Sequence, residues 1–262
     1  MRRTEVISHI VKWLSDYLVQ SGAKGFVVGV SGGIDSAVVS TLAAKTGKPV
    51  LLLEMSIHQP PDQVSRSQEH IKNLIEKFPN VTGKNIDITR TFESLKADLS
   101  VDEGNKNNNL SLANTRSRLR MITLYYYAGI NNFLVCGTGN KVEDFGVGFY
   151  TKYGDGGVDI SPIADLLKSQ VYELAKELGV SESIQKAKPT DGLWADDRSD
   201  EDQIGATYPE LEWAMSVHDD HTVSDFSGRE REVFGIYDRL NKLAQHKINP
   251  IPVCKIPEDL LK

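Results

Sequence analysis

Residues 26–39 read FVVGVSGGIDSAVV. The apolar run 26–30, bounded by a glycine and a serine, is typical of a buried parallel strand. Residues 31–33, Ser-Gly-Gly, predict a turn with little side-chain bulk, and the residues from Ile34 onward predict a helix. A strand, a glycine turn and a helix N-terminus leave several free N–H groups converging on one point. That point is an anion site suited to phosphate or pyrophosphate.

The spacing of the glycines separates this turn from two common phosphate loops. The chain contains no G-x-x-x-x-G-K-[ST], and Gly29, Gly32 and Gly33 do not fit G-x-G-x-x-G. Asp35 falls in the first helical turn, where a carboxylate either offsets the helix dipole or holds a metal ion beside the phosphates. Because a bare carboxylate would repel phosphate, the pattern favours a bound magnesium ion.

Composition limits the class of protein. A chain of 262 residues suits one large α/β domain, or one domain with small additions. A net charge of -6 provides no overall attraction for nucleic acid. Cys136 and Cys254 make neither a disulfide framework nor a C-x-x-C site, and no stretch resembles a signal peptide or a membrane span. We therefore expect a cytoplasmic protein with no membrane or nucleic-acid partner.

Strands and helices are expected to alternate along the chain. Further apolar runs without alternation predict buried strands near 49–55 and 132–136, and residues 84–88 predict a third strand between them. Apolar periodicity predicts helices over 4–18, 62–78, 110–127, 168–178 and 228–246. This order indicates an α/β fold, a doubly wound, Rossmann-like parallel sheet flanked by helices. Ligands of such sheets bind at the carboxyl edge of the strands.

Three polar segments interrupt this pattern. The asparagine-rich stretch 98–110 predicts a mobile surface loop, and the acidic, turn-rich stretch 188–205 predicts a lid. Residues 141–159 are too rich in glycine for a helix and too polar for a core strand. Within them, residues 148–159 interleave glycine with lysine and aspartate, which favours a loop that wraps a ligand. The arginines within 116–120 form either a solvated basic face or a site for phosphate or carboxylate.

Several motifs together carry a family resemblance. The loop 31–36 resembles the SGGxDS pyrophosphate loop of the ATP pyrophosphatase (PP-loop) superfamily. The stretches 114–121 (NTRSRLRM), 151–157 (TKYGDGG), 188–190 (KPT) and 246–247 (HK) follow in the order seen in ammonia-dependent NAD synthetases. The resemblance covers most of the chain. It implies a single synthetase domain over 1–262 of ATP pyrophosphatase type, without a glutaminase domain, so that free ammonia is the nitrogen donor.

The resemblance also implies the chemistry and the residues that perform it. In this family ATP adenylates the nicotinate carboxylate of deamido-NAD, pyrophosphate leaves, and ammonia attacks the acyl adenylate to give NAD and AMP. Mg²⁺ is the implied cofactor and ATP the co-substrate. The matching ATP contacts are Gly29, Val30, Ser31, Gly32, Gly33, Ile34, Asp35, Ser36, Thr138, Lys168 and Thr190. Asp35 and Glu143 match metal ligands, Arg118, Lys152, Asp159, His246 and Lys247 match contacts to deamido-NAD, and Asp155 and Lys168 match catalytic positions, with Asp155 orienting ammonia or taking its proton.

Some alternatives remain open from the sequence. The chain has one residue more than the usual spacing between Asn140 and Lys152, so Asp144 competes with Glu143 for the metal. The resemblance implies a homodimer with deamido-NAD in the interface. Competing functions are a nicotinamide mononucleotide synthetase, another PP-loop amide or thiolation enzyme, and a nucleotide-binding regulatory module that does no chemistry. Acidic charge and unpaired cysteines disfavour the transfer-RNA thiolases.

Overall fold

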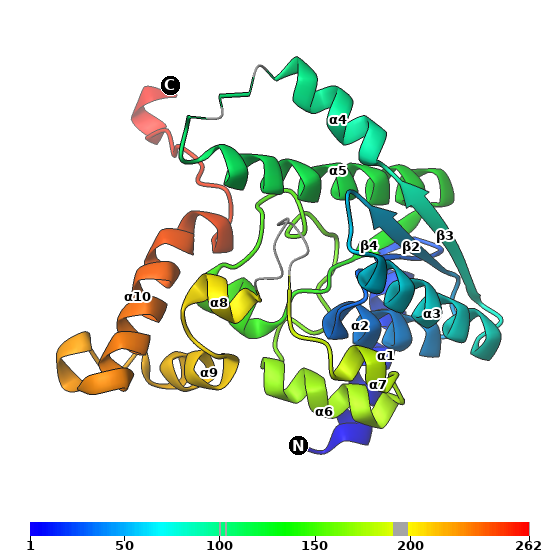
Figure 1. The fold of residues 1–262 in the computed structure, drawn as a ribbon, viewed down its shortest axis with the longest axis horizontal. Coiled ribbons are helices and arrows are strands. Elements are labelled where there is room, and N and C mark those ends of the chain that lie inside the picture. The colour runs from blue at the N-terminus through cyan, green and yellow to red at the C-terminus, as the bar shows by residue number, and fades with distance from the viewer. Residues whose placement is uncertain (100, 103, 191–198, 262) are drawn as a thin grey trace.

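The computed structural model describes residues 1–99, 101–102, 104–190 and 199–261. Its centre is a parallel sheet with the strand order β3-β2-β1-β4 (Figure 1). The strands are β1 (Gly25–Gly29), β2 (Val50–Ser56), β3 (Val81–Asp87) and β4 (Phe133–Cys136). From β1 the chain builds outward to β3 and then returns to place β4 on the other side of β1. This reversal confirms the predicted doubly wound sheet and puts its switch point between β1 and β4.

Helices cover both faces of the sheet (Figure 1). One face carries α1 (Arg3–Ser21), α2 (Ile34–Lys45), α3 (Pro61–Lys77) and α6 (Lys168–Leu178), and the other carries α5 (Asn108–Asn131). Phe26 and Val28 of β1 pack in the first layer, whereas Val27 packs in the second with Ala128 of α5. The central strands β1 and β2 are therefore buried on both faces, which explains why their residues are apolar without alternation.

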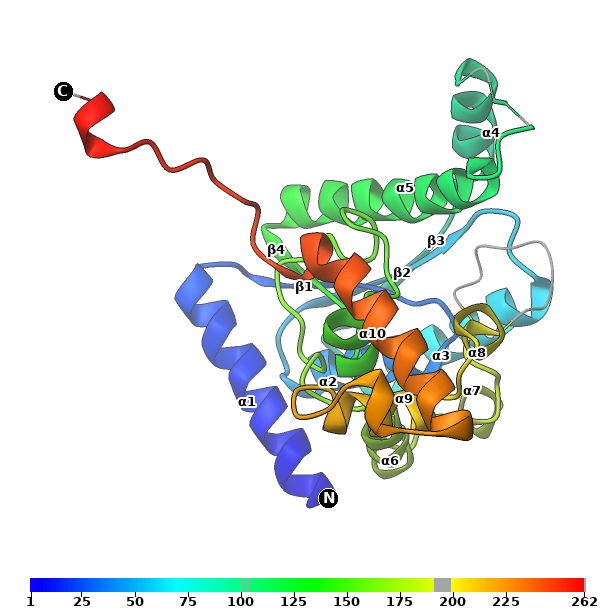
Figure 2. The same ribbon diagram turned by 90° about the vertical axis from the view of Figure 1, so that its left-hand side faces the viewer.

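A second group of helices packs beside the carboxyl edge of the sheet. A separate apolar cluster joins a π-helix, η1 (Val142–Val147), to α8 (Asp200–Ile204), α9 (Tyr208–Val217) and α10 (Gly228–Ile248). Figure 2 shows α10 running along α9, with the chain after α10 leading out from the body. The remaining elements are α4 (Thr89–Asp98), α7 (Glu182–Gln185), η2 (Val223–Asp225) and η3 (Glu258–Leu260). Within the described ranges, no helix has the length and apolarity to cross a membrane.

The structure differs from the predicted elements in several places. The π-helix η1 lies in a segment predicted to be loop, and its start is capped by Asn140, whose Oδ1 accepts hydrogen bonds from the N–H groups of Val142 (3.1 Å) and Glu143 (3.2 Å). The predicted loop 98–110 is shorter, because α5 already begins at Asn108. Of the predicted lid, residues 191–198 lie outside the described residues and 200–204 form α8.

Candidate active site

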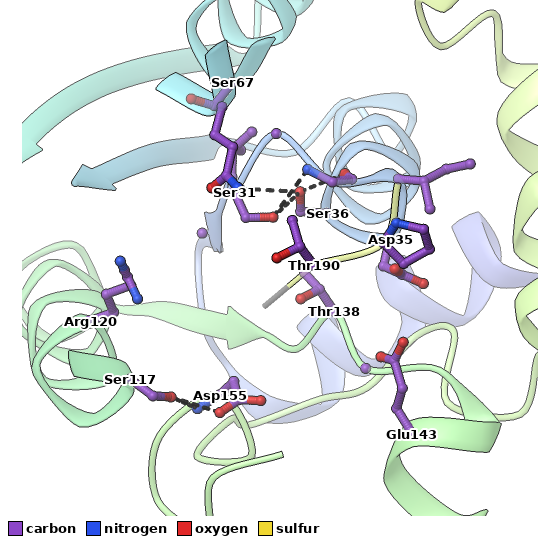
Figure 3. Close-up of a pocket in the computed structure, with 18 of the residues that line it drawn as sticks. Ser31, Asp35, Ser36, Ser67, Ser117, Arg120, Thr138, Glu143, Asp155 and Thr190 are labelled. Carbon is purple, nitrogen blue, oxygen red and sulfur yellow. Dashed lines mark hydrogen bonds between the residues drawn. The ribbon is translucent and has the colours of Figure 1, made fainter. Parts of the chain in front are cut away.

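A cavity of ≈ 260 Å³ opens at the carboxyl ends of β1 and β4, and residues 29–36 form one of its walls. Gly32 has a φ of 82°, and a Cβ there would lie 2.7 Å from the carbonyl oxygen of Gln63, so the turn requires glycine. The Ser36 hydroxyl donates to the carbonyl of Gly33 (2.9 Å) and accepts from the N–H of Ser31 (3.2 Å), which fixes the turn (Figure 3). Helix α2 starts at Gly33 without a side-chain cap, so its first N–H groups are available to an anion.

Lys168, the first residue of α6, places an ammonium group between two carboxylates. Its Nζ donates to Oδ2 of Asp35 at 2.5 Å and to Oε1 of Glu143 at 3.0 Å. Asn140 donates to the other oxygen of Asp35 (3.2 Å), and the Tyr208 hydroxyl donates to Oε1 of Glu143 (2.5 Å). The Lys168 side chain is only 4% exposed. The fold thus assembles one buried charged cluster from α2, η1, α6 and α9.

Burial and charge act in opposite directions within this cluster. Burial disfavours the Lys168 ammonium, but the attraction of Asp35 and Glu143 outweighs burial and raises the pKa of Lys168. Burial raises the pKa of Asp35, and the nearby ammonium opposes that rise. Burial and the negative charge of Glu143 raise the pKa of Tyr208, so its hydroxyl keeps its proton and remains a donor. Lys168 therefore supplies the positive charge that opposes the effect of burial on Asp35.

The same two carboxylates fit a hard divalent cation. Asp35 and Glu143 direct oxygen atoms at one point, now filled by the ammonium of Lys168, and carboxylate oxygens suit Mg²⁺. Among the described residues, no group of three or more His, Cys, Asp or Glu side chains is arranged to hold a metal. The described part of the chain thus offers Asp35 and Glu143 as ligands, and phosphate oxygens of a nucleotide would complete the set.

Asp144 has a different environment from its neighbour Glu143. A Cβ added at Gly139 would lie 2.2 Å from the Asp144 carboxylate, which shows how closely that carboxylate lies against the backbone after β4. Burial, helped by the negative charges of Glu143, Asp155 and Asp35, raises the pKa of Asp144 to about 8. Glu143, by contrast, shares the Lys168 ammonium with Asp35, so the geometry favours Glu143.

Asp155 lies within the TKYGDGG stretch, residues 151–157. Its Oδ1 accepts from the Ser117 hydroxyl (2.7 Å) and from the N–H of Thr151 (2.9 Å), and its own N–H donates to the Ser117 oxygen (2.8 Å). The residue borders the open cavity, yet its carboxyl group is surrounded by protein, and this burial raises its pKa. Ser117 of α5 therefore fixes a carboxyl group of raised proton affinity at the cavity wall (Figure 3).

The residues predicted for ATP and metal come together in this cavity. Every one of them lines it: Gly29, Val30, Ser31, Gly32, Gly33, Ile34, Asp35, Ser36, Thr138, Glu143, Lys168 and Thr190, together with Asp155. Thr138 follows β4, and Thr190 reaches the same space from the segment after α7 (Figure 3). Residues as far apart in the sequence as Gly29 and Thr190 thus share one site.

The five residues predicted to contact deamido-NAD lie outside the wall of this cavity. Arg118 donates to the carbonyl of Lys152 (3.3 Å), and the Lys152 ammonium in turn donates to the carbonyl of His246. Lys247 donates to backbone carbonyls of the 148–150 turn. Asp159 accepts from the Tyr125 hydroxyl (2.9 Å) and the N–H of Val135 (2.8 Å). These side chains link the 148–159 loop to α5, β4 and α10, and their contact with substrate stays a prediction.

The arginines of 116–120 do not form one anion site. Arg116 stacks over the Phe92 ring, with its guanidinium carbon 4.8 Å from the ring centroid. Arg120 alone lines the cavity, where it donates to the carbonyl of Met55 (3.0 Å). Residues two positions apart on a helix point in different directions, so the closeness of these arginines in the sequence does not bring their side chains together.

The sequence did not identify three residues of the site, Asn140, Ser117 and Tyr208. Asn140 and Ser117 fall within stretches already noted, yet nothing in those stretches marks a ligand of Asp35 or Asp155. Tyr208 gives no local signal, because its partner Glu143 lies 65 positions earlier. Only the packing of α9 against η1 joins them.

Comparison with known proteins identifies the family. The family model described as NAD synthase matches residues 6–250. The chain belongs to the NAD synthase family, a family of ligases. It is 37% identical to a curated relative, the NH(3)-dependent NAD(+) synthetase of Syntrophomonas wolfei. The alignment spans 263 residues and covers 99% of this chain and 99% of that protein. The Mesoplasma florum enzyme of the same name is 35% identical, over 95% of this chain and 96% of that protein.

Solved structures of NAD synthase relatives support the fold. The NMN synthetase of Francisella tularensis superposes with a TM-score of 0.85 at 32% identity, over 98% of this chain and 100% of that one. The NH3-dependent NAD synthetase of Campylobacter jejuni superposes with a TM-score of 0.77 over 97% and 100%. Because the two sequences are only 24% identical, this comparison supports the fold alone.

Proposed function

We propose that this protein amidates the nicotinate carboxylate of deamido-NAD with free ammonia, using ATP and releasing AMP and pyrophosphate. The observation that carries the proposal is one cavity that joins an uncapped helix N-terminus to the Lys168–Asp35–Glu143 cluster. That cavity belongs to a chain whose curated relatives are named NH(3)-dependent NAD(+) synthetase. We further propose that residues 1–262 act as one catalytic domain in the cytoplasm.

In the first step the nicotinate carboxylate oxygen attacks the α-phosphorus of ATP, and the bond to pyrophosphate breaks. Both reactants are anions, so the site must neutralise charge more than supply a nucleophile. The N–H groups of 31–36 bind the departing pyrophosphate, and the Lys168 ammonium moves from its two carboxylates onto phosphate oxygens. Thr138, which follows β4, and Thr190, which follows α7, hold the nucleotide from two different segments of the cavity wall.

Asp35 and Glu143 are the residues that would hold Mg²⁺, as the oxygen donors around Lys168 indicate. When bound, Mg²⁺ supplies charge neutralisation at the phosphates. Tyr208 and Asn140 keep the two carboxylates oriented for this role by donating to them.

In the second step the ammonia nitrogen attacks the acyl carbon, and the carbon–oxygen bond to AMP breaks. The nitrogen then carries one proton more than the amide requires. Asp155, with its raised pKa and its carboxyl oxygen fixed by Ser117, is placed to orient ammonia and take that proton. Arg118, Lys152, Asp159, His246 and Lys247 would bind deamido-NAD at the side of the cavity, in the interface of a homodimer.

A second candidate is amidation of nicotinate mononucleotide, the same chemistry on a smaller substrate. It is favoured by the likeness to the Francisella tularensis structure described as NMN synthetase. The deciding experiment supplies ATP, Mg²⁺ and ammonium with either deamido-NAD or nicotinate mononucleotide in parallel. We expect equal amounts of AMP and NAD from deamido-NAD. Faster turnover of the mononucleotide would select the second candidate, and formation of ADP, or no turnover of either, would refute both.

A further inference from the structure

Helix α3 contributes a cationic side chain, Arg66, to the wall of the active-site cavity. This side chain is only 19% exposed. Within the described residues, its Nε atom is buried and has no hydrogen-bond partner. A buried donor without an acceptor is unfavourable and rare in folded proteins. The nitrogen therefore marks a place on the cavity wall where a bound acceptor would stabilise the side chain.

The stem of Arg66 begins beside the glycine turn of residues 31–33. A Cβ added at Gly32 would lie 3.4 Å from the Cβ of Arg66 and 3.3 Å from the backbone nitrogen of Ser67. Figure 3 shows Ser67, the next residue of α3, next to Ser31 of the turn. Rotation of the Arg66 side chain can therefore bring its guanidinium to an anion that is bound at the turn.

Helix α3 itself is fixed in place. His70 Nε2 and the Ser40 hydroxyl of α2 share a hydrogen bond of 2.9 Å, and both residues are buried. Ile71 and Leu74 of α3 pack in the same apolar layer as α2. Because α2 and α3 are held together behind the turn, the guanidinium can change partner without a movement of the helix.

The present partner of Arg66 is easily exchanged. Its Nη1 donates to Oδ2 of Asp62 at 2.6 Å, one helical turn earlier, and the Asp62 side chain is 66% exposed. Solvent-exposed pairs of this kind contribute little to stability. Lys168, by contrast, is held by two carboxylates that are nearly buried. Arg66 is therefore the cation that can turn to an anionic ligand at the lower cost.

The charges of the cavity favour such a turn. Lys168, Asp35 and Glu143 together carry one more negative charge than positive charge when all three are ionised. A further cation would thus help this wall to hold phosphate, and a guanidinium can donate to two phosphate oxygens at once.

We propose that Arg66 leaves Asp62 and binds the pyrophosphate portion of ATP, and that it keeps this contact with the pyrophosphate that departs. The inference rests on the proposed function in taking ATP as the ligand, and it adds a phosphate-binding residue on α3 to that site. Asp62 acts as the partner of Arg66 while no nucleotide is bound.

Isothermal titration calorimetry of the full-length protein with inorganic pyrophosphate, and separately with AMP, provides the test. Both titrations are made in excess Mg²⁺. Arg66→Met should raise the Kd of pyrophosphate at least about tenfold, because hydrogen bonds between charged groups are lost. The Kd of AMP should stay as in wild type. Equal binding of pyrophosphate by Arg66→Met and wild type, an equal loss of AMP binding, or a wild-type protein that does not bind pyrophosphate would each overturn the proposal.

Two control variants separate binding from structure. Asp62→Asn removes the partner of Arg66 and should bind pyrophosphate at least as tightly as wild type, whereas a merely structural role of the pair predicts the same loss as in Arg66→Met. Lys12→Met breaks a similar pair with Asp16 on α1 and should bind as wild type. A loss in Asp62→Asn as large as that in Arg66→Met would contradict the proposal. Product formation from deamido-NAD is assayed separately, so a wild-type protein that binds pyrophosphate through Arg66 but makes no NAD would refute the proposed function alone.

Discussion

Replacing Lys168 by methionine tests whether one ammonium holds the active-site carboxylates together. The side chain of Lys168 is 4% exposed, and those of Asp35 and Glu143 are each 16% exposed. Methionine keeps the length and the apolar stem but removes the charge. The variant therefore leaves two nearly buried carboxylates facing each other without a counter-ion.

The structure sets the size of the effect. Removing one partner of a buried ion pair costs about 3–5 kcal/mol, because the remaining charge is left uncompensated. For a domain of this size each kcal/mol shifts the melting temperature by about 2–4 °C, so we expect a fall of roughly 6–20 °C. Lys141→Met is the matched control, since its ion pair with Asp165 is on the surface, and such pairs contribute about 0–1 kcal/mol.

Thermal unfolding followed by circular dichroism, in EDTA and then in excess Mg²⁺, provides the measurement. Added Mg²⁺ should raise the melting temperature of Lys168→Met more than that of wild type, because a cation between the carboxylates replaces the lost ammonium. Burial raises the pKa of Asp35, and without Lys168 this rise has no strong opposition. A carboxyl group with a raised folded-state pKa stabilises the protein at low pH and loses that contribution as pH rises, so the deficit should be smaller near about pH 5 than near about pH 8. If Lys168→Met has the same melting temperature as wild type in EDTA at both pH values, the reasoning is refuted.

Three further predictions concern single side chains. Asp35→Asn should abolish Mg²⁺-dependent turnover while the protein stays folded, and retention of the full rate would disprove its assignment as a metal ligand. Tyr208→Phe removes the donor to Glu143, a hydrogen bond to a charged group worth about 1.5–3 kcal/mol, so the Mg²⁺ concentration for half-maximal rate should rise by about tenfold or more, whereas Tyr237→Phe should leave it unchanged. Burial lowers the pKa of His70 from 6.5 to about 4. Between these pH values His70 is protonated in the unfolded state and neutral in the folded state. The free energy of unfolding should therefore fall by about 3 kcal/mol as pH drops from about 6.5 to 4, and equilibrium denaturation of His70→Gln should lack this slope.

The sequence by itself determined the parts of this protein that depend on neighbours in the chain. The strand, glycine turn and helix of 26–39 fix the anion-binding wall, because backbone geometry over a few residues is set by local side-chain bulk. The non-alternating strands determined a sheet buried on both faces, and the motif order determined the family. The glycine content of the whole 141–159 stretch was misleading for residues 142–147, because the hydrogen bonds from Asn140 and the packing of Val142 and Val147 with α9 and α10 stabilise η1 there.

Only the tertiary structure decided how distant charges meet. It brought the Tyr208 hydroxyl and the Lys168 ammonium to Glu143, which is why we propose Glu143 rather than Asp144 as the metal ligand. It also separated the predicted dinucleotide contacts, such as Lys152 and Lys247, from the cavity wall. The physical reason is that burial and Coulomb energy depend on distance through space, and a sequence records only distance along the chain.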